Sequence, residues 1–136
     1  MLDAIRIRFQ EISRLLNAPD ERTTFRTTPE HDGSWHCEQD GETFHFVITE
    51  RGMEVERQTT RDAYELLYWL VSDVTFGMAI DYELQSRGSN DSDKTDGRNV
   101  WMRHQVELLR TVNKSWADSK HLEHSSMLSR EAKNDG

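Results

Sequence analysis

Near the start of the chain, apolar side chains recur at intervals of three and four positions, which is the spacing of one helix face. The members of this series are Leu2, Ile5, Phe9, Ile12 and Leu16. Pro19 follows the series and disfavours helical geometry at the residue before it. The spacing therefore predicts an amphipathic helix over residues 1–18.

From residue 22 to residue 58 the apolar period changes to two, which is typical of β-strands. Alternating positions mark four short segments, at residues 23–27, 35–37, 44–48 and 53–55. The breaks between them contain Gly33, Gly41 and Gly52, and glycine can take the positive backbone angle that a tight reversal needs. We therefore predict a four-stranded antiparallel β-meander over residues 22–58.

The predicted sheet has one apolar face and one solvent-facing side, because neighbouring side chains of a strand point to opposite faces. Trp35 and Phe44 are expected on the core side. The residues expected on the solvent-facing side are His36, His45, Glu54 and Glu56.

Residues 60–87 form the most apolar stretch of the chain and predict one long helix, with Thr60 as its N-terminal cap. Two apolar stripes run along it. The first includes Tyr64, Leu67 and Val71, and the second includes Leu66, Leu70 and Gly77. A helix with two such stripes is covered on more than one side. We expect the sheet to cover one flank, and the first and last helices to cover the other.

Asp73 falls within the second apolar stripe of this helix. A buried carboxylate without a partner is costly, so we predict a structural ion pair with a cation from the following segment. Arg98 and Arg103 are the main candidates, and His104 is a third. A functional carboxylate displayed in a gap is the alternative.

The rest of the chain divides into an acidic loop at residues 88–97, helices at residues 98–130 and a frayed tail at residues 131–136. We predict one domain over residues 1–136. Its fold class is α+β: an N-terminal helix, the four-stranded meander, and a C-terminal helical half whose long central helix packs on the sheet.

Composition narrows the class of protein. Hydrophobic residues make up 35% and charged residues 31%, which favours a soluble folded chain over a disordered or membrane-embedded one. The net charge of -8 repels nucleic acid and attracts basic partners. The first residues carry charges where a signal peptide needs an apolar block, and the single Cys37 fits a reducing compartment. We therefore expect a cytoplasmic protein with no membrane or nucleic-acid partner.

A search for chemical motifs gives no active-site constellation. The sequence has no nucleophile elbow and no phosphate-binding glycine loop. His121 and His124 could chelate a metal from one helix face, but zinc needs at least three protein ligands. Residues 91–102 resemble a calcium loop, yet Asp96 stands where glycine is required and Met102 where glutamate is required. We expect no catalysis, no cofactor and no metal.

Three stretches, "AYELLYWLVSDVTFGMAIDYELQSR", "DGR" and "QVELLRTVNKSW", resemble immunity proteins of bacterial polymorphic-toxin and contact-dependent inhibition systems. The residues that carry the resemblance are Tyr64, Trp69, Tyr82, Glu83, Arg87, Asp96, Arg98, Gln105, Leu109 and Trp116. The resemblance covers about half of the chain. It implies a cytoplasmic antidote that binds one toxin domain tightly, without catalysis.

An acidic antidote could mimic the nucleic-acid substrate of a basic nuclease toxin. We therefore expect acidic residues of the solvent-facing side of the sheet and of the acidic loop to contact the toxin. These residues are Glu38, Asp40, Glu54, Glu56, Asp91, Asp93 and Asp96. An ordinary solvated surface is the alternative at each single position.

Two other classes of function stay open at this point. The first is a small metal-dependent hydrolase that uses histidines with Asp73 or Glu123. The second is an adaptor that binds another protein through an apolar helix face.

Overall fold

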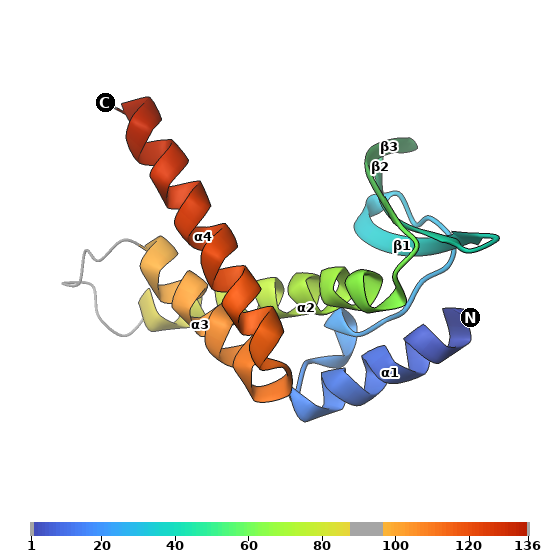
Figure 1. The fold of residues 1–136 in the computed structure, drawn as a ribbon, viewed down its shortest axis with the longest axis horizontal. Coiled ribbons are helices and arrows are strands. Elements are labelled where there is room, and N and C mark those ends of the chain that lie inside the picture. Colours follow the sequence, from blue (N-terminus) through green and yellow to red (C-terminus); the bar gives the residue numbers. More distant parts are fainter. Residues whose placement is uncertain (1, 88–96, 136) are drawn as a thin grey trace. The chain divides into compact units, whose positions relative to one another are not determined.

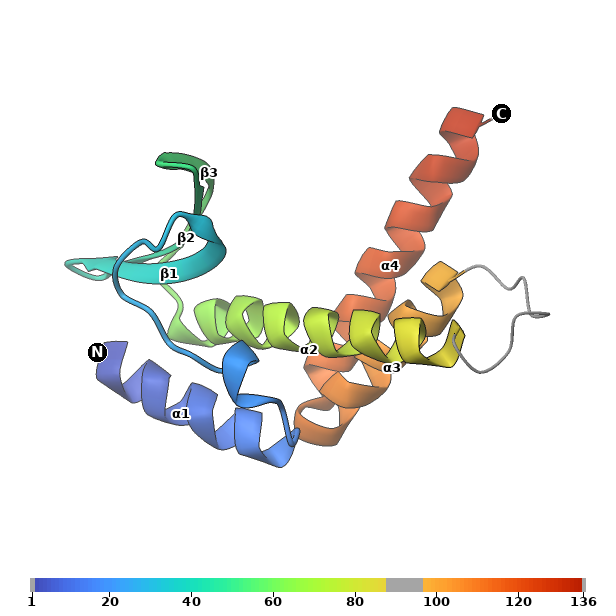
Figure 2. The same ribbon diagram turned by 180° about the vertical axis from the view of Figure 1, so that it is seen from behind.

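The chain folds as helix α1, a short 3-10 turn, three antiparallel strands and three further helices (Figures 1 and 2). The computed structural model describes residues 2–87 and 97–135. The chain divides into an N-terminal unit, Met1–Val71, and a C-terminal unit, Ser72–Gly136. Helix α2 runs through the boundary between them. The α+β class is confirmed, with three strands in place of the four predicted.

Helix α1, Leu2–Leu15, buries the predicted apolar stripe. Ile5, Phe9 and Ile12 are each at most 5% exposed. The helix ends where Asn17 takes a positive φ of 56°, two residues before Pro19. The predicted N-terminal helix is therefore confirmed, and its stripe supplies one wall of the core of the N-terminal unit.

The sheet consists of β1, Asp32–Asp40, β2, Thr43–Glu50, and β3, Met53–Thr60, in the order β1-β2-β3. Both reversals are tight, because Asp40 pairs with Thr43 and Glu50 pairs with Met53. Gly41 and Gly52 take the positive φ values of 62° and 79° that these turns need. The strand reversals predicted at these two glycines are confirmed.

The fourth strand, predicted at residues 23–27, is wrong. This segment follows the 3-10 turn Asp20–Arg22 as extended chain outside the sheet. The backbone N–H of Cys37 donates to the carbonyl of Arg26 at 2.9 Å, but a ladder needs such bonds in series. The apolar alternation has another cause, because the ring of Phe25 packs between those of Phe9 and Trp35.

An aromatic cluster joins the elements of the N-terminal unit. It runs through Phe9 on α1, Phe25, Trp35 on β1, Phe46 on β2 and Trp69 on α2, with ring centroids 5.7 to 6.5 Å apart. Such rings attract one another through tilted and edge contacts in addition to the area they bury. The contact between Phe46 and Trp69 joins the sheet to the first part of α2.

Helix α2, Ala63–Arg87, begins three residues later than predicted. The side chain of Asp62 accepts a hydrogen bond from the backbone N–H of Tyr64 at 2.9 Å, so Asp62 and not Thr60 caps the helix. Thr60 belongs to β3, and its hydroxyl accepts from the N–H of Asp62 at 3.0 Å. Thr60 thus shapes the link between strand and helix.

The C-terminal unit consists of the later part of α2, helix α3, Gly97–Val112, and helix α4, Lys114–Asp135. Asn113 separates the last two helices, and its side chain accepts a hydrogen bond from the N–H of Trp116 at 3.1 Å, as an N-terminal cap does. Helix α4 extends past the expected boundary at residue 130. Arg98 of α3 forms an ion pair with Glu131, which holds this part of α4 against α3.

Gln105 is the polar centre of the C-terminal unit and is only 2% exposed. Its side-chain nitrogen donates to the carbonyl of Ser72 at 3.0 Å and to the hydroxyl of Thr75 at 3.2 Å, both on α2. Its oxygen lies 3.0 Å from Nε2 of His124 on α4. One buried amide therefore joins three helices, and both its nitrogen and its oxygen have protein partners.

Candidate functional site

Negative charge lies on the sheet and on the segment that follows it. Residues 32–60 contain seven acidic residues and two arginines, which gives this segment a net charge of -5. Residues 61–96 contain eight acidic and three basic residues and have the same net charge. Residues 97–135, which form α3 and α4, contain seven basic and five acidic residues and are net positive. A partner that is attracted by negative charge will therefore be directed to the sheet and to residues 61–96, and away from α3 and α4.

Arg57 of β3 lies between two of the sequence-predicted carboxylates. Its Nη1 donates to Glu38 of β1 at 3.2 Å, and its Nε and Nη2 donate to Glu54 at 3.0 and 2.7 Å. His36 completes the group, with Nε2 lying 2.8 Å from the second carboxylate oxygen of Glu38. We call these four residues, His36, Glu38, Glu54 and Arg57, the Arg57 cluster.

The strand register explains how the cluster forms. Arg57 is opposite Val47 on β2, and Val47 is opposite His36 on β1. To reach Glu38, the side chain of Arg57 must cross over β2 on that face of the sheet. The aliphatic part of an arginine can cover apolar surface while its charged end stays paired. Val47, at 1% exposure, and His36, at 2%, lie on the face that Arg57 crosses.

The burial of His36 corrects a prediction, because this residue was expected on the solvent-facing side. Its Nδ1 has no hydrogen-bond partner within the described part of the chain. His45, also expected there, is half-buried, with Nδ1 2.9 Å from the hydroxyl of Thr59. The second face of the sheet is thus partly closed.

The cluster shifts the ionisation of its members. Hydrogen bonding from His36, and then from Arg57, lowers the pKa of Glu38 below its ordinary value. Hydrogen bonding from Arg57 lowers the pKa of Glu54, and the two carboxylates raise the pKa of Arg57. Glu38, Glu54 and Arg57 are therefore all charged near neutral pH, and together they carry one net negative charge.

The structure brings together Glu38 and Glu54, but not Glu56. Glu56 pairs with Ile48, which pairs with Trp35, so Glu56 lies on the Trp35 side of the sheet. The expectation that Glu54 and Glu56 share a face is wrong. The register shift between Ile48 and Thr49 is the reason, since it places an extra residue between the two glutamates.

Four carboxylates of the sheet and its reversals have neither an ion pair nor a side-chain hydrogen bond in the described ranges, whereas Asp32 accepts hydrogen bonds from Ser34. All four are exposed, and they are Asp40, Glu42, Glu50 and Glu56. We call them the open carboxylates. Asp40 and Glu42 lie at the reversal between β1 and β2, and Glu50 lies at the reversal between β2 and β3. Their charges are available to a partner, whereas those of Glu38 and Glu54 are shared with Arg57.

Sequence reasoning missed Arg57, Glu42 and Glu50. Opposite charges on neighbouring strands can be found from the register. Arg57 and Glu38 escape that rule because a whole strand, β2, lies between them. Glu42 and Glu50 could have been found, since acidic residues next to predicted reversals are exposed.

The other predicted site residues are placed as follows. The acidic-loop residues Asp91, Asp93 and Asp96 lie outside the described residues. Asp73 is exposed on α2, and Arg103 is exposed on α3. Arg98 pairs with Glu131. The ion pair of Asp73 with Arg98 or Arg103 stays a prediction.

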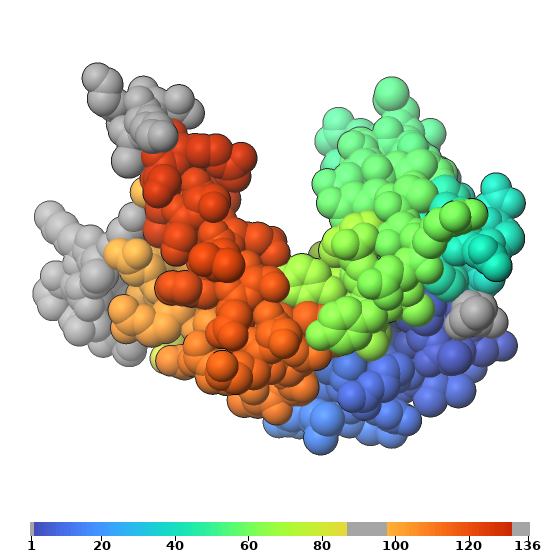
Figure 3. All heavy atoms as spheres, in the orientation of Figure 1, coloured from blue at the N-terminus to red at the C-terminus, as the bar shows by residue number. Residues whose placement is uncertain are grey.

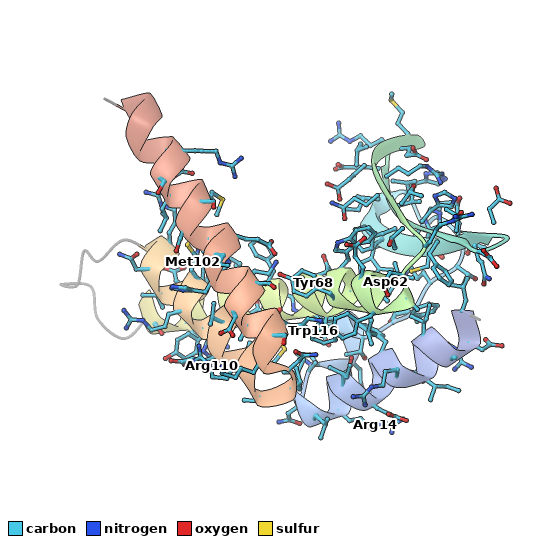
Figure 4. All side chains as sticks on the ribbon, in the orientation of Figure 1. Arg14, Asp62, Tyr68, Met102, Arg110 and Trp116 are labelled. Atoms are coloured by element: carbon cyan, nitrogen blue, oxygen red, sulfur yellow. The ribbon has the colours of Figure 1, made fainter. Side chains whose placement is uncertain are left out.

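A cavity of about 290 Å³ lies between α3 and α4. Met102 and Arg110, both labelled in Figure 4, are among its lining residues on α3. The rest of the lining consists of Asn99, Arg103, Val106, Glu107, His121, His124, Ser125 and Leu128. The floor is apolar and the rim carries both signs of charge.

His124 at this cavity is a neutral, structural histidine. Burial lowers its pKa to about 4. Because the nitrogen of Gln105 is occupied by donation to α2, the oxygen of Gln105 faces His124, and Nε2 of the ring must carry the proton. Its partner in the predicted chelating pair, His121, is exposed.

The remaining reactive groups are placed for packing. Burial raises the pKa of Cys37 to about 12, so its thiol stays protonated. Within residues 2–87 and 97–135, no three His, Cys, Asp or Glu side chains are grouped as they would be around a metal ion. No helix in those same ranges combines the length and the apolar character of a membrane span.

Comparison with known proteins gives one finding. A family model described as "Imm63: Immunity protein 63" matches residues 40–126. The match spans β2, β3, α2, α3 and the first half of α4, and it contains Arg57, Glu54 and all four open carboxylates. No curated protein and no solved structure matches the chain.

Proposed function

This chain belongs to the immunity protein 63 family of polymorphic-toxin immunity proteins, and we propose that it neutralises a nuclease-type toxin domain through the acidic surface of its sheet. An immunity protein acts on a cognate toxin, so the partner is a protein. The observation that carries the proposal is the charge of the sheet segment, which is -5 within residues 32–60, whereas residues 97–135 are net positive.

A nuclease binds a polyanion, and its substrate cleft is therefore lined with basic side chains. An acidic surface that fits over such a cleft keeps the substrate out and is drawn to it by long-range attraction. The four open carboxylates supply this attraction, because no cation of the described chain is paired with them. The acidic loop residues Asp91, Asp93 and Asp96 are proposed to add to it.

The Arg57 cluster has a different part in this proposal. Its charges are mutually paired, so it contributes little long-range attraction. It fixes one face of the sheet, because both Glu38 and Glu54 are held in place by the same guanidinium. A surface that is already ordered loses less entropy when a partner binds. We further propose that binding takes place in the cytoplasm, where a nuclease meets its substrate.

The test uses the cognate toxin domain. Reversing Asp40 and Glu42 to Lys together should slow association at low salt by about tenfold and flatten its dependence on salt. The matched control reverses Glu21 and Glu107, which are exposed, lie outside the sheet and form no ion pair with another described residue. Stopped-flow association rates for both double variants give the comparison.

Equal slowing in the two double variants would show that net charge alone matters and would contradict a role for the sheet.

A second experiment tests whether the toxin is a nuclease. The isolated toxin domain should degrade DNA or RNA, and one equivalent of this chain should stop the degradation. A toxin domain that leaves both polymers intact would contradict the nuclease assignment and leave the docking surface to be judged by the association rates.

A further inference from the structure

We propose that the outer edge of β3 receives a strand of the toxin, which extends the sheet from three strands to four. This inference rests on the proposed function, because it concerns the same partner and the same sheet. It goes further by naming the mode of recognition, which is backbone hydrogen bonding along a strand edge.

Strand β3 is open along its whole length. It is the last strand in the order β1-β2-β3, and no other strand within the described residues pairs with its outer side. Residues 53–59 are all exposed, and Thr60 is half-buried. Even the apolar side chains of Met53 and Val55 are 69% and 58% exposed. The space-filling view shows the atoms of this strand on the outside of the N-terminal unit (Figure 3).

The opposite edge of the sheet is different, because the chain before β1 runs beside it (Figure 2). The backbone N–H of Cys37 donates to the carbonyl of Arg26 at 2.9 Å, so this edge is already engaged at its centre. The side chain of Cys37 is fully buried there. Of the two edges, only that of β3 is available to a partner strand.

Exposed edges are usually protected against pairing by proline, by lysine or by a bulge. The sequence of β3, "MEVERQTT", contains neither proline nor lysine. It does contain the register shift next to Glu54, which limits regular pairing to residues 56–60. This run is as long as an ordinary short strand and is sufficient for a docked strand.

The register identifies the backbone groups that point outward. The residues that flank a two-residue turn form a hydrogen-bonded pair, which here are Asp40 with Thr43 and Glu50 with Met53. Bonding alternates along β2 from these two points. Phe44 and Phe46 therefore bond to β3, and His45 bonds to β1.

Arg57 and Thr59 consequently occupy the positions of β3 that do not bond to β2. They are opposite Val47 and His45. Their N–H and C=O groups point away from the sheet. They are two residues apart, which is the spacing at which a neighbouring strand forms backbone hydrogen bonds. Gln58, between them, bonds inward to Phe46.

Charge decides between a toxin strand and a second copy of this chain. Two copies joined along β3 would bring together two sheets that each carry a net charge of -5. A strand of a basic toxin domain meets the same surface with attraction, and its basic side chains can reach Glu56 beside the edge. We therefore commit to the toxin as the occupant.

The first test is residue-resolved hydrogen exchange by NMR, on the intact chain alone and bound to the toxin domain. The outward amides of Arg57 and Thr59 should exchange at least about tenfold more slowly in the complex, because they gain acceptors. The amide of Gln58 is the internal control, since it is bonded to β2 in both states. Unchanged exchange at Arg57 and Thr59 in a formed complex would overturn the inference.

The second test replaces Thr59 with proline and, as its matched control, with alanine. Both changes remove the hydroxyl that contacts His45, but only Thr59→Pro removes the outward N–H. Proline is tolerated on an edge strand where that N–H faces solvent. Thr59→Pro should weaken toxin binding by about tenfold relative to Thr59→Ala, as measured by titration calorimetry.

The outcomes separate the inference from the function on which it rests. If the toxin domain does not bind the wild-type chain at all, the proposed function fails. If it binds and Thr59→Pro matches Thr59→Ala, strand addition fails alone. If the isolated chain is dimeric by light scattering and its outward amides are already protected, the edge belongs to a second copy and the toxin strand is excluded. Should Thr59→Pro not fold, the exchange measurement on the wild-type complex decides.

Discussion

Arg57 shows how one charged side chain can change the character of a sheet face. Its stem crosses β2 over Val47, and its guanidinium is held by Glu38 on one side and Glu54 on the other. With its side chain 35% exposed, the guanidinium remains in contact with solvent while the residues beneath it do not. The methylene groups of Arg57 provide apolar surface on this face of the sheet.

Replacing Arg57 with alanine should therefore lower the free energy of unfolding by about 1 kcal/mol. The ion pairs are well exposed and contribute little, so most of the loss comes from wetting of Val47 and His36. Chemical denaturation at neutral pH measures the change. Arg61→Ala is the matched control, because Arg61 is exposed and forms no ion pair within residues 2–87 and 97–135, and it should leave the stability unchanged. Equal losses in both variants would contradict the covering role.

His124 makes the stability depend on pH. Burial lowers its pKa to about 4 in the folded chain, against an ordinary value of 6.5. The folded state therefore binds fewer protons than the unfolded state, and stability that is present above pH 6.5 is lost as the pH falls toward 4. Between pH 7 and pH 5 the wild-type chain should lose about 2 kcal/mol more than His124→Gln.

Glutamine at position 124 can still donate to Gln105 but cannot titrate. The variant therefore separates the effect of protonation on stability from the effect of the hydrogen bond. Chemical denaturation at the two pH values gives the four free energies needed. The lowered pKa values of Glu38 and Glu54 do not interfere, since their contribution is lost only below their ordinary value of 4.5. Parallel pH profiles for wild type and variant would contradict a neutral, buried His124.

At the scale of elements, the helices could be predicted because their apolar spacing records burial directly. The stripe of α1 lies where the sequence indicates, and so do Leu66, Leu70 and Val71 of α2, which are each at most 1% exposed. Tyr64 of the first predicted stripe is an exception, because it is 50% exposed. Three strands and both glycine reversals follow from the same logic. These features depend on local periodicity and turn chemistry, which the sequence carries in full.

The errors arise where contacts are not local. Phe25 has the spacing of a strand residue because its ring fills a gap beside Trp35, and no periodicity distinguishes the two cases. Glu56 changes face because of a register shift that only the pairing of β2 with β3 defines. The Arg57 cluster spans three strands, so even a correct strand assignment would not have revealed it. The Asp73 ion pair and the acidic loop stay predictions.

At the scale of the whole molecule, we propose that the chain unfolds as one domain, as its sequence predicts. The boundary between the two units falls inside α2, between Val71 and Ser72, with no loop that would let them separate. Breaking a helix in its middle costs nucleation of a new end on each side. Coupled unfolding is the expected result.

Chemical denaturation followed by two probes tests this. Tryptophan fluorescence reports on Trp35 and Trp69 in one unit and on Trp101 and Trp116 in the other, and far-ultraviolet circular dichroism reports mainly on the helices. Both signals should give the same midpoint and the same slope. Separate transitions, or midpoints that differ between the probes, would show two domains.

The open carboxylates at the strand reversals have a consequence for how this antidote diversifies. Asp40, Glu42 and Glu50 are exposed at the ends of tight turns, where no neighbouring side chain depends on their identity. These three carboxylates can be substituted one at a time, so the protein can adapt to a different toxin. The aromatic cluster and Arg57 meanwhile keep the fold intact. Different residues thus determine which toxin is recognised and whether the chain folds.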